Sequence, residues 1–329
     1  MKYAYFPGCS LEKNASAYHV SAMAATRPFG VEFAEVDDWN CCGATEYIAL
    51  NLMAAYTLVT RNLALTAQMQ DLEADRAGMK QLVAPCSACF LNLSKVEKYL
   101  CDSPSLNSKV NEALAAGGMH YDPGGLRVRH LLDVIVNDIG LETVAAKVTN
   151  PLKGLRIAPY YGCLIVRPAF QGVFDDHEQP TSLDRLVETL GAEVVDFSMK
   201  AQCCGGHMTQ ISQPVAMEML RRIFKNAEDS QADLIVTLCP MCQLNLDAYQ
   251  GDVNRYFRTK FNLPVLYFTQ LMGLALGIPA DELEIGKEFV DARPALARIG
   301  QEHEVEGPPG KKKRPSKEAL PMPGMTEGR

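Results

Sequence analysis

The sequence contains no long apolar segment. Nowhere in its 329 residues do about 18 uncharged apolar residues run together, the length that a membrane-spanning helix requires. The stretch Met1–Cys9 also lacks the apolar core of a signal peptide. We therefore expect a cytoplasmic protein without a direct membrane span.

An excess of positive charge is also missing. The chain has 32 Lys and Arg residues against 39 Asp and Glu residues, which gives a net charge of −7 at pH 7. Proteins that bind nucleic acids usually carry a basic face. The balance of charge therefore argues against DNA or RNA as a partner.

Two cofactor signatures are absent as well. No Gly-x-Gly-x-x-Gly follows a predicted strand, so we expect neither a flavin nor a nicotinamide on this chain. No Cys-x2-Cys-x2-Cys-x3-Cys-Pro run occurs, so conventional cubane clusters would have to lie in another polypeptide.

Cysteine, in contrast, is abundant, with 11 residues. Disulfides are rare in the cytosol because its thiols are kept reduced, so these cysteines are expected to bind metal. Ten of them form two sets of five with the same order, and only Cys101 lies outside. The sets are Cys9, Cys41, Cys42, Cys86 and Cys89, then Cys163, Cys203, Cys204, Cys239 and Cys242.

The spacing of the two sets indicates an internal duplication. Equivalent cysteines are separated by 154, 162 and 153 residues, and Leu91–Leu93 recurs as Leu244–Leu246 at the same offset of 153. The interval before the Cys-x2-Cys pair is longer in the first set, and its extra charged residues, 68–80, are expected to form a surface extension.

Three segments follow from this pattern. We predict a first half over residues 1–150, a second half over 151–286 and a flexible tail over 287–329. The tail is rich in Glu, Lys, Pro and Gly and has few large apolar residues to bury, so it should be disordered. Its basic tetrad Lys311–Arg314 is expected to be solvated, with docking to an acidic partner as the alternative.

Short apolar runs alternate with helical patterns in both halves. Lys2–Phe6, Val31–Val36 and Gln81–Ala84 read as strands, and residues 46–70 as one long helix without Gly or Pro. Such alternation predicts an α/β protein with two pseudo-symmetric Rossmann-like halves and mainly parallel sheets. Since the cysteines follow the strands, each set should converge at the carboxyl edge of its sheet.

The donor set limits the metal. All-sulfur sites favour zinc or iron–sulfur clusters, and both a structural zinc and a cubane cluster take four ligands. A fifth thiol indicates a cluster that is not an ordinary cube. A zinc or thiol redox sensor remains open at this point.

The motifs themselves carry a resemblance to a known family. "PGCS", "NCCGA" and "PCSACF", with "GCL", "QCCGGH" and "CPMC", match a duplicated cysteine-rich CCG motif, and residues 1–286 resemble the B subunit of heterodisulfide reductase. The resemblance implies two noncubane [4Fe-4S] clusters, the first held by Cys9, Cys41, Cys42, Cys86 and Cys89. It implies that the second is held by Cys163, Cys203, Cys204, Cys239 and Cys242.

By the same resemblance, the chain would be an oxidoreductase acting on sulfur groups, reducing or forming a disulfide between the two clusters. Its partners would be a disulfide or thiol substrate, a subunit-C-like ferredoxin protein and a flavin-bearing A subunit. An alternative function is a CCG-type electron-transfer subunit of a quinone-linked dehydrogenase of the succinate, glycolate or lactate type.

Some neighbouring residues are further candidates. His207, directly after Cys-Cys-Gly-Gly, could donate a proton in catalysis or a hydrogen bond to the sulfurs of a cluster. His130 is expected to be structural. Asn92 and Asn245 are expected to cap the following helix. The glycines that flank the cysteines should allow the backbone a close approach.

Overall fold

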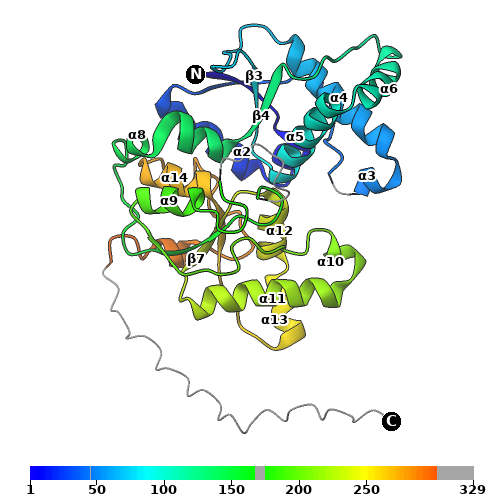
Figure 1. Cartoon of the computed structure of the whole chain (residues 1–329). Coiled ribbons are helices and arrows are strands. Elements are labelled where there is room, and N and C mark those ends of the chain that lie inside the picture. Colours follow the sequence, from blue (N-terminus) through cyan, green and yellow to red (C-terminus); the bar gives the residue numbers. More distant parts are fainter. Residues whose placement is uncertain (45, 167–174, 302–329) are drawn as a thin grey trace, which may run out of the picture.

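The computed structural model describes residues 1–44, 46–166 and 175–301. The first half contains β1 (Lys2–Tyr5), α1 (Gly8–Glu12), α2 (Ser16–Thr26), the 3-10 helix η1 (Arg27–Phe29), β2 (Glu32–Glu35), α3 (Glu46–Leu50), α4 (Leu52–Gln68), β3 (Lys80–Ala84), α5 (Ser87–Asp102), α6 (Pro104–Ala115), β4 (Leu126–His130), α7 (Leu131–Asp133), the π-helix η2 (Val134–Gly140) and α8 (Leu141–Ala145). These elements occupy the upper part of Figure 1.

The second half lies below them (Figure 1). It contains β5 (Arg156–Tyr160), α9 (Ser182–Thr189), β6 (Glu193–Val194), α10 (Met208–Ile211), α11 (Gln213–Asp229), β7 (Leu234–Thr237), α12 (Pro240–Ala248), α13 (Gln250–Phe257), β8 (Val265–Tyr267), α14 (Phe268–Ala275) and α15 (Arg293–Leu296).

Each half is built on a four-stranded sheet, and the strand orders are equivalent. The order is β2-β1-β3-β4 in the first half and β6-β5-β7-β8 in the second, with every pair parallel. The strands are short and largely buried, as expected where helices cover a parallel sheet. The prediction of an α/β protein with two similar, parallel-stranded halves is confirmed.

The strand order places a topological switch point beside the first strand of each sheet. In the first half β2 lies on one side of β1, and β3 lies on the other side. Ligands of open α/β sheets bind at such a switch point, outside the carboxyl ends of the strands. Cys9 follows β1 and Cys86 follows β3, while Cys163 and Cys239 follow the equivalent strands β5 and β7.

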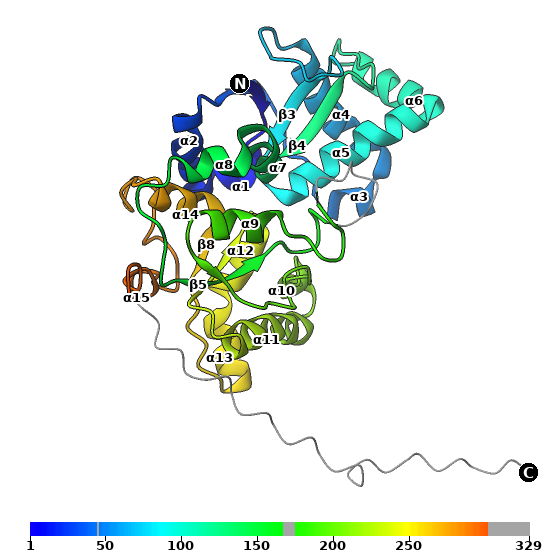
Figure 2. The same ribbon diagram turned by 60° about the vertical axis from the view of Figure 1, so that its left-hand side comes forward.

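The two halves share a core. One cluster of buried apolar side chains includes Tyr5, Leu93 and Leu131 of the first half together with Leu183 and Phe268 of the second. Helix α2 of the first half packs along α14 of the second, and Figures 1 and 2 both show these helices side by side. A second cluster of buried residues belongs to the second half alone.

The predicted long helix over residues 46–70 is wrong in one respect. It is divided into α3 and α4 at Asn51, whose backbone is extended and whose side chain accepts a hydrogen bond from Ala54 N at 3.0 Å. An asparagine that accepts this bond caps a helix N-terminus, so it starts a new helix here. Leu50, just before it, is 81% exposed.

The start of the predicted tail also needs correction. Residues 287–301 fold back onto the second half, because the buried Asp247 carboxylate accepts hydrogen bonds from Phe289 N and Val290 N, both at 2.9 Å. Farther along, Arg298 pairs with the Asp233 carboxylate. Residues 302–329, with the basic tetrad, lie outside the described residues.

Candidate functional site

All ten paired cysteines lie at the carboxyl edges of the two sheets. In the first half, Cys9 lies in α1 just after β1, Cys41 and Cys42 lie in the loop after β2, and Cys86 and Cys89 flank the first turn of α5. The equivalent places in the second half are occupied by Cys163, Cys203, Cys204, Cys239 and Cys242. Cys101 lies apart, at the far end of α5 near Glu97.

The ten thiols form one continuous series. The Sγ atoms of Cys9 and Cys41 are 3.7 Å apart, and those of Cys42 and Cys89 are 3.3 Å apart. Interactions between neighbouring thiols that shift their pKa values continue the series in the order Cys9, Cys41, Cys42, Cys89, Cys86, Cys239, Cys242, Cys204, Cys203 and Cys163. The two sets therefore meet at Cys86 and Cys239, one from each half.

Close contact between neighbouring thiols shifts their pKa values in opposite directions. Cys41 accepts hydrogen bonds from the Cys42 and Cys9 thiols, which lowers the pKa of Cys41 to about 2. The same contact with Cys41 raises the pKa of Cys42 to about 12. In the second half the pKa of Cys203 is likewise lowered to about 2 and that of Cys204 raised to about 12. A metal that bound each complete set would have to displace protons from the neutral thiols.

Two glycines bring the backbone against the sulfurs. Gly8 has φ +72°, and a Cβ atom there would lie 2.8 Å from Cys89 Sγ. Gly162 has φ +68°, and its Cβ would lie 2.9 Å from Cys242 Sγ. Any side chain at either position would clash with a thiol and strain the backbone. The backbone thus comes close to a thiol at both glycines, and its expected approach to a cluster stays a prediction.

Two equivalent asparagines hold the Cys-Cys-Gly loops. Asn92 is buried in α5 and donates to Cys42 O at 3.0 Å. Asn245 is buried in α12 and donates to Gly206 O at 2.8 Å and to Cys204 O at 3.3 Å. Their predicted role as caps is wrong, because both lie within helices and reach back to the preceding loop. The recurrence of Leu-Asn-Leu was the sequence signal for this role.

The residue before each cysteine pair is held in a different way in each half. Asn40 donates its backbone N–H to Asn62 Oδ1 and accepts from Asn62 Nδ2, both at 2.9 Å. Gln202 accepts from the Tyr160 hydroxyl at 2.7 Å. Both anchors fix the loop that carries two neighbouring thiols.

The two candidate histidines lie in different surroundings. His207 is partly exposed and directly precedes α10, three residues after Cys204. His130 ends β4, is fully buried and accepts a hydrogen bond from Leu132 N at 3.1 Å through Nδ1. Burial lowers the pKa of His130 to about 4, so its ring is neutral at pH 7.

The donors of each set suit an iron–sulfur group. All five are thiols, and glycine backbone beside them leaves room next to the sulfurs. Among residues 1–44, 46–166 and 175–301, no three ligating side chains surround one point as a single metal ion would require. The adjacent cysteines of each Cys-Cys pair can face different atoms of a larger group.

Duplicated α/β halves, each with five thiols at the carboxyl edge of its sheet, define a class of cysteine-rich protein. The model of the CCG cysteine-rich domain matches the chain twice, over residues 3–94 and 157–247. The chain belongs to this family.

Its relatives include subunits of reductases. The chain is 36% identical over 291 residues to the 8-methylmenaquinol:fumarate reductase membrane anchor subunit of Wolinella succinogenes, covering 88% of this chain and 98% of that protein. It is 29% identical to the B subunit of a ferredoxin/F420H2-dependent CoB-CoM heterodisulfide reductase of Methanosarcina acetivorans, covering 91% and 97%. The resemblance to the B subunit of heterodisulfide reductase is confirmed.

A solved structure shares the fold. A hypothetical protein from Helicobacter pylori superposes with a TM-score of 0.67 at 14% identity, covering 88% of this chain and 52% of that one. Within the part of the chain that is described, no helix has both the length and the hydropathy needed to cross a membrane.

Proposed function

We propose that the chain is the iron–sulfur catalytic subunit of a heterodisulfide reductase-like complex. The observation that carries the proposal is the meeting of the two equivalent thiol sets, where the Ser87 hydroxyl, next to Cys86, donates to Leu238 O, next to Cys239, at 3.5 Å. Two redox groups side by side suit a reaction that needs two electrons. In that reaction a disulfide takes up two electrons and two protons and yields two thiols, and the reverse reaction forms the disulfide.

The proposed cofactors are two noncubane [4Fe-4S] clusters. The first would be held by Cys9, Cys41, Cys42, Cys86 and Cys89. The second would be held by Cys163, Cys203, Cys204, Cys239 and Cys242. When bound, each cluster would supply one electron at a time, so that the pair meets the demand of one disulfide.

The chain itself orients the thiols and excludes water between them. Cys86 and Cys239 are 6% and 1% exposed, whereas Cys9 and Cys41 reach solvent. Burial of Cys86 and Cys239 lowers the effective dielectric constant around them, which strengthens electrostatic interactions there. The solvent-exposed end of the first set is the side nearest to an incoming electron carrier.

His207 is the proposed proton donor. It follows the second Cys-Cys-Gly loop and is partly exposed, so it can exchange protons with solvent. Imidazole is the side-chain group most suited to proton transfer near neutral pH, and a ring N–H could protonate a thiolate that leaves the substrate. Replacement of His207 by Gln should slow turnover without removing the iron.

The proposed partners are a subunit-C-like ferredoxin protein and a flavin-bearing A subunit. Relatives named as subunits of reductases support a complex. A cytoplasmic location belongs to the same proposal, because a reducing compartment keeps cysteines available to bind metal.

A second candidate function is electron transfer in a quinone-linked dehydrogenase. It is favoured by the 36% identity to the Wolinella protein, whose name refers to 8-methylmenaquinol and fumarate. Under this alternative, a menaquinol analogue would change the electron paramagnetic resonance signal of the anaerobic protein, and disulfides would leave it unchanged.

The test of the leading proposal is a disulfide reductase assay with an artificial electron donor. Cys42→Ala should abolish turnover of every accepted disulfide, because it removes a buried ligand of the first set. Cys101→Ala is the matched control, since it removes a thiol outside both sets, and it should keep wild-type activity. Full activity of Cys42→Ala would refute the proposal.

A further inference from the structure

Helix α2 belongs to the first half by sequence but is anchored in the second. Its Ser21 Oγ lies 2.6 Å from Thr269 Oγ1 of α14, and both residues are fully buried. Its Ser16 hydroxyl donates to the Glu284 carboxylate at 2.7 Å. A side chain carried by α2 is therefore positioned by both halves at once.

Tyr18 is such a side chain. Its hydroxyl donates to Pro85 O at 3.0 Å and to Leu238 O at 3.2 Å, and no part of it is exposed. Pro85 and Leu238 are equivalent residues, separated by 153 positions, and each directly precedes the first cysteine of a Cys-x2-Cys pair. One hydroxyl hydrogen is thus shared between the turns that carry Cys86 and Cys239.

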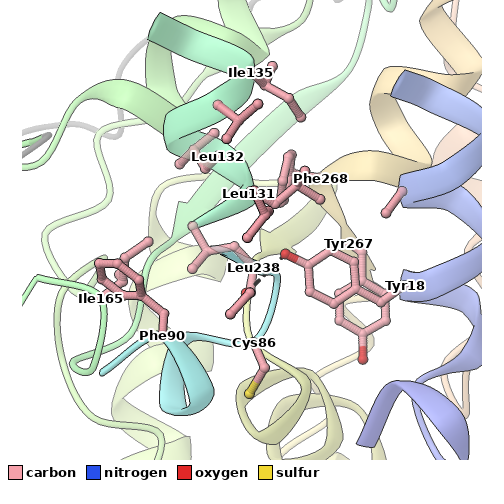
Figure 3. Close-up of a cluster of buried hydrophobic side chains, with 14 of the residues drawn as sticks. Tyr18, Cys86, Phe90, Leu131, Leu132, Ile135, Ile165, Leu238, Tyr267 and Phe268 are labelled. Carbon is pink, nitrogen blue, oxygen red and sulfur yellow. Dashed lines mark hydrogen bonds between the residues drawn. The ribbon is translucent and has the colours of Figure 1, made fainter. Parts of the chain in front are cut away.

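The Tyr18 ring is fixed as well as its hydroxyl. It stacks on the Tyr267 ring with centroids 4.4 Å apart and an interplanar angle of 8°. Figure 3 shows this pair beside Cys86 and Leu238. The Tyr267 hydroxyl, in contrast, has no hydrogen-bond partner among the described residues. The two stacked rings therefore differ in hydrogen bonding, since the Tyr18 hydroxyl has two acceptors and the Tyr267 hydroxyl has none among the described residues.

We propose that Tyr18 is a positioning residue that sets the separation of the two thiol sets where they meet. The peptide group that accepts its hydrogen bond in each half is the one that leads into Cys86 or Cys239, so a shift of that group carries the cysteine with it. Burial raises the pKa of Tyr18 well above its ordinary value, so the hydroxyl keeps its proton and remains a donor.

Hydrogen exchange of the full-length, metal-free chain tests this role without any bound cluster. Tyr18→Phe keeps the ring and removes the shared bond, so amides of residues 84–90 and 237–243 should both exchange about fivefold faster, the factor for one typical net hydrogen bond. Tyr267→Phe removes the unpartnered hydroxyl of the same stack and should leave both segments at the wild-type rate.

Three outcomes would overturn the proposal. Exchange in Tyr18→Phe could stay at the wild-type rate, it could rise in only one of the two segments, or Tyr267→Phe could accelerate both segments equally. Should Tyr18→Phe not fold, Ser21→Ala takes its place. That variant loosens α2 from α14 and should accelerate the same two segments together, and wild-type rates in it would contradict the role of α2.

A second readout rests on the proposed function. In protein loaded with iron and sulfide, Tyr18→Phe should change the magnetic interaction between the two paramagnetic centres, while Tyr267→Phe should preserve it. An unchanged interaction in Tyr18→Phe would count against the proposal. Chains that bind no iron would instead refute the proposed function, and the hydrogen-exchange result would stand independently.

Discussion

The two halves of the molecule have the same strand order and the same five thiol positions, yet they differ in access to solvent. Cys9 and Cys41 are exposed, while their counterparts Cys163 and Cys203 are partly buried. The two halves thus share the strand order and the thiol positions, but the exposure of their thiols differs. A substitution in one half can therefore be compared with the equivalent substitution in the other.

Their anchors and charges differ too. Phe6 stands two residues before Gly8, where the second half has Tyr160 before Gly162, so the hydroxyl that holds the second loop has no counterpart in the first. The cleft beside the exposed thiols is lined by four carboxylates, those of Glu12, Glu35, Asp37 and Asp38. The corresponding cleft near Gln202 has three, those of Glu178, Asp184 and Asp196, and Lys200 pairs with Asp184. An anionic molecule is repelled more strongly at the first cleft.

The largest effect is expected from removal of one buried cysteine in each half. Cys42→Ala and Cys204→Ala should each lower iron and acid-labile sulfide to about half of the wild-type content, because each would disable one cluster of two. Metal analysis of anaerobically purified protein checks this. Loss of all iron from either variant would show instead that the halves do not bind independently.

The loop-holding asparagines should differ in their effects on stability. Asn92→Ala and Asn245→Ala each leave buried carbonyl groups without a donor, a loss of about 1–3 kcal/mol. Asn245 donates to two carbonyls and Asn92 to one, so Asn245→Ala should be the more destabilising in denaturant unfolding of the metal-free chain. Asn14→Ala, at an exposed asparagine, is the control, and a larger cost for Asn92→Ala would break the comparison.

The buried His130 predicts a pH dependence that the second half lacks, since Tyr267 occupies the equivalent strand end. The pKa of His130 falls from 6.5 to about 4 on folding, so the unfolded chain binds more protons and stability decreases as pH falls through this interval. Between pH 7 and pH 5 this amounts to about 2 kcal/mol.

Denaturant unfolding at the two pH values measures this dependence. His130→Asn keeps an acceptor for Leu132 N but does not titrate, so it should lose less stability over the same interval. An equal loss in the variant and the wild type would assign the pH dependence to other groups.

The smallest effect is expected in the rates of thiol alkylation. In the metal-free chain, iodoacetamide should modify Cys9 and Cys41 a few-fold faster than Cys163 and Cys203, because the first pair is exposed and the second partly buried. Peptide mass spectrometry at short reaction times reads the order. Faster modification of Cys163 and Cys203 would contradict the predicted difference in solvent access.

Much of the fold was predictable because the central strands β1, β3, β5 and β7 are short apolar runs with a cysteine just after them. The break at Asn51 was missed, since Asn disfavours a helix interior only slightly and its capping bond depends on local geometry. The ordered segment 287–301 was missed for another reason. Its few large apolar residues are scattered among charged ones, and its place depends on the distant carboxylates of Asp247 and Asp233.

For the site, the order and spacing of the thiols were sufficient to group them in two sets. The contact between Cys86 and Cys239 was beyond reach of spacing alone, because it depends on how the two sheets pack. The same holds for Tyr18, whose only sequence signal is a helical position facing inward. The role of His207 and the boundary at residue 150 stay predictions.

Counting iron, acid-labile sulfide and zinc in the anaerobically purified full chain shows directly which metal the two thiol sets bind. We predict about eight iron and eight sulfide per chain, divided equally between the two thiol sets, with no stoichiometric zinc. Two zinc ions per chain without sulfide would contradict this prediction.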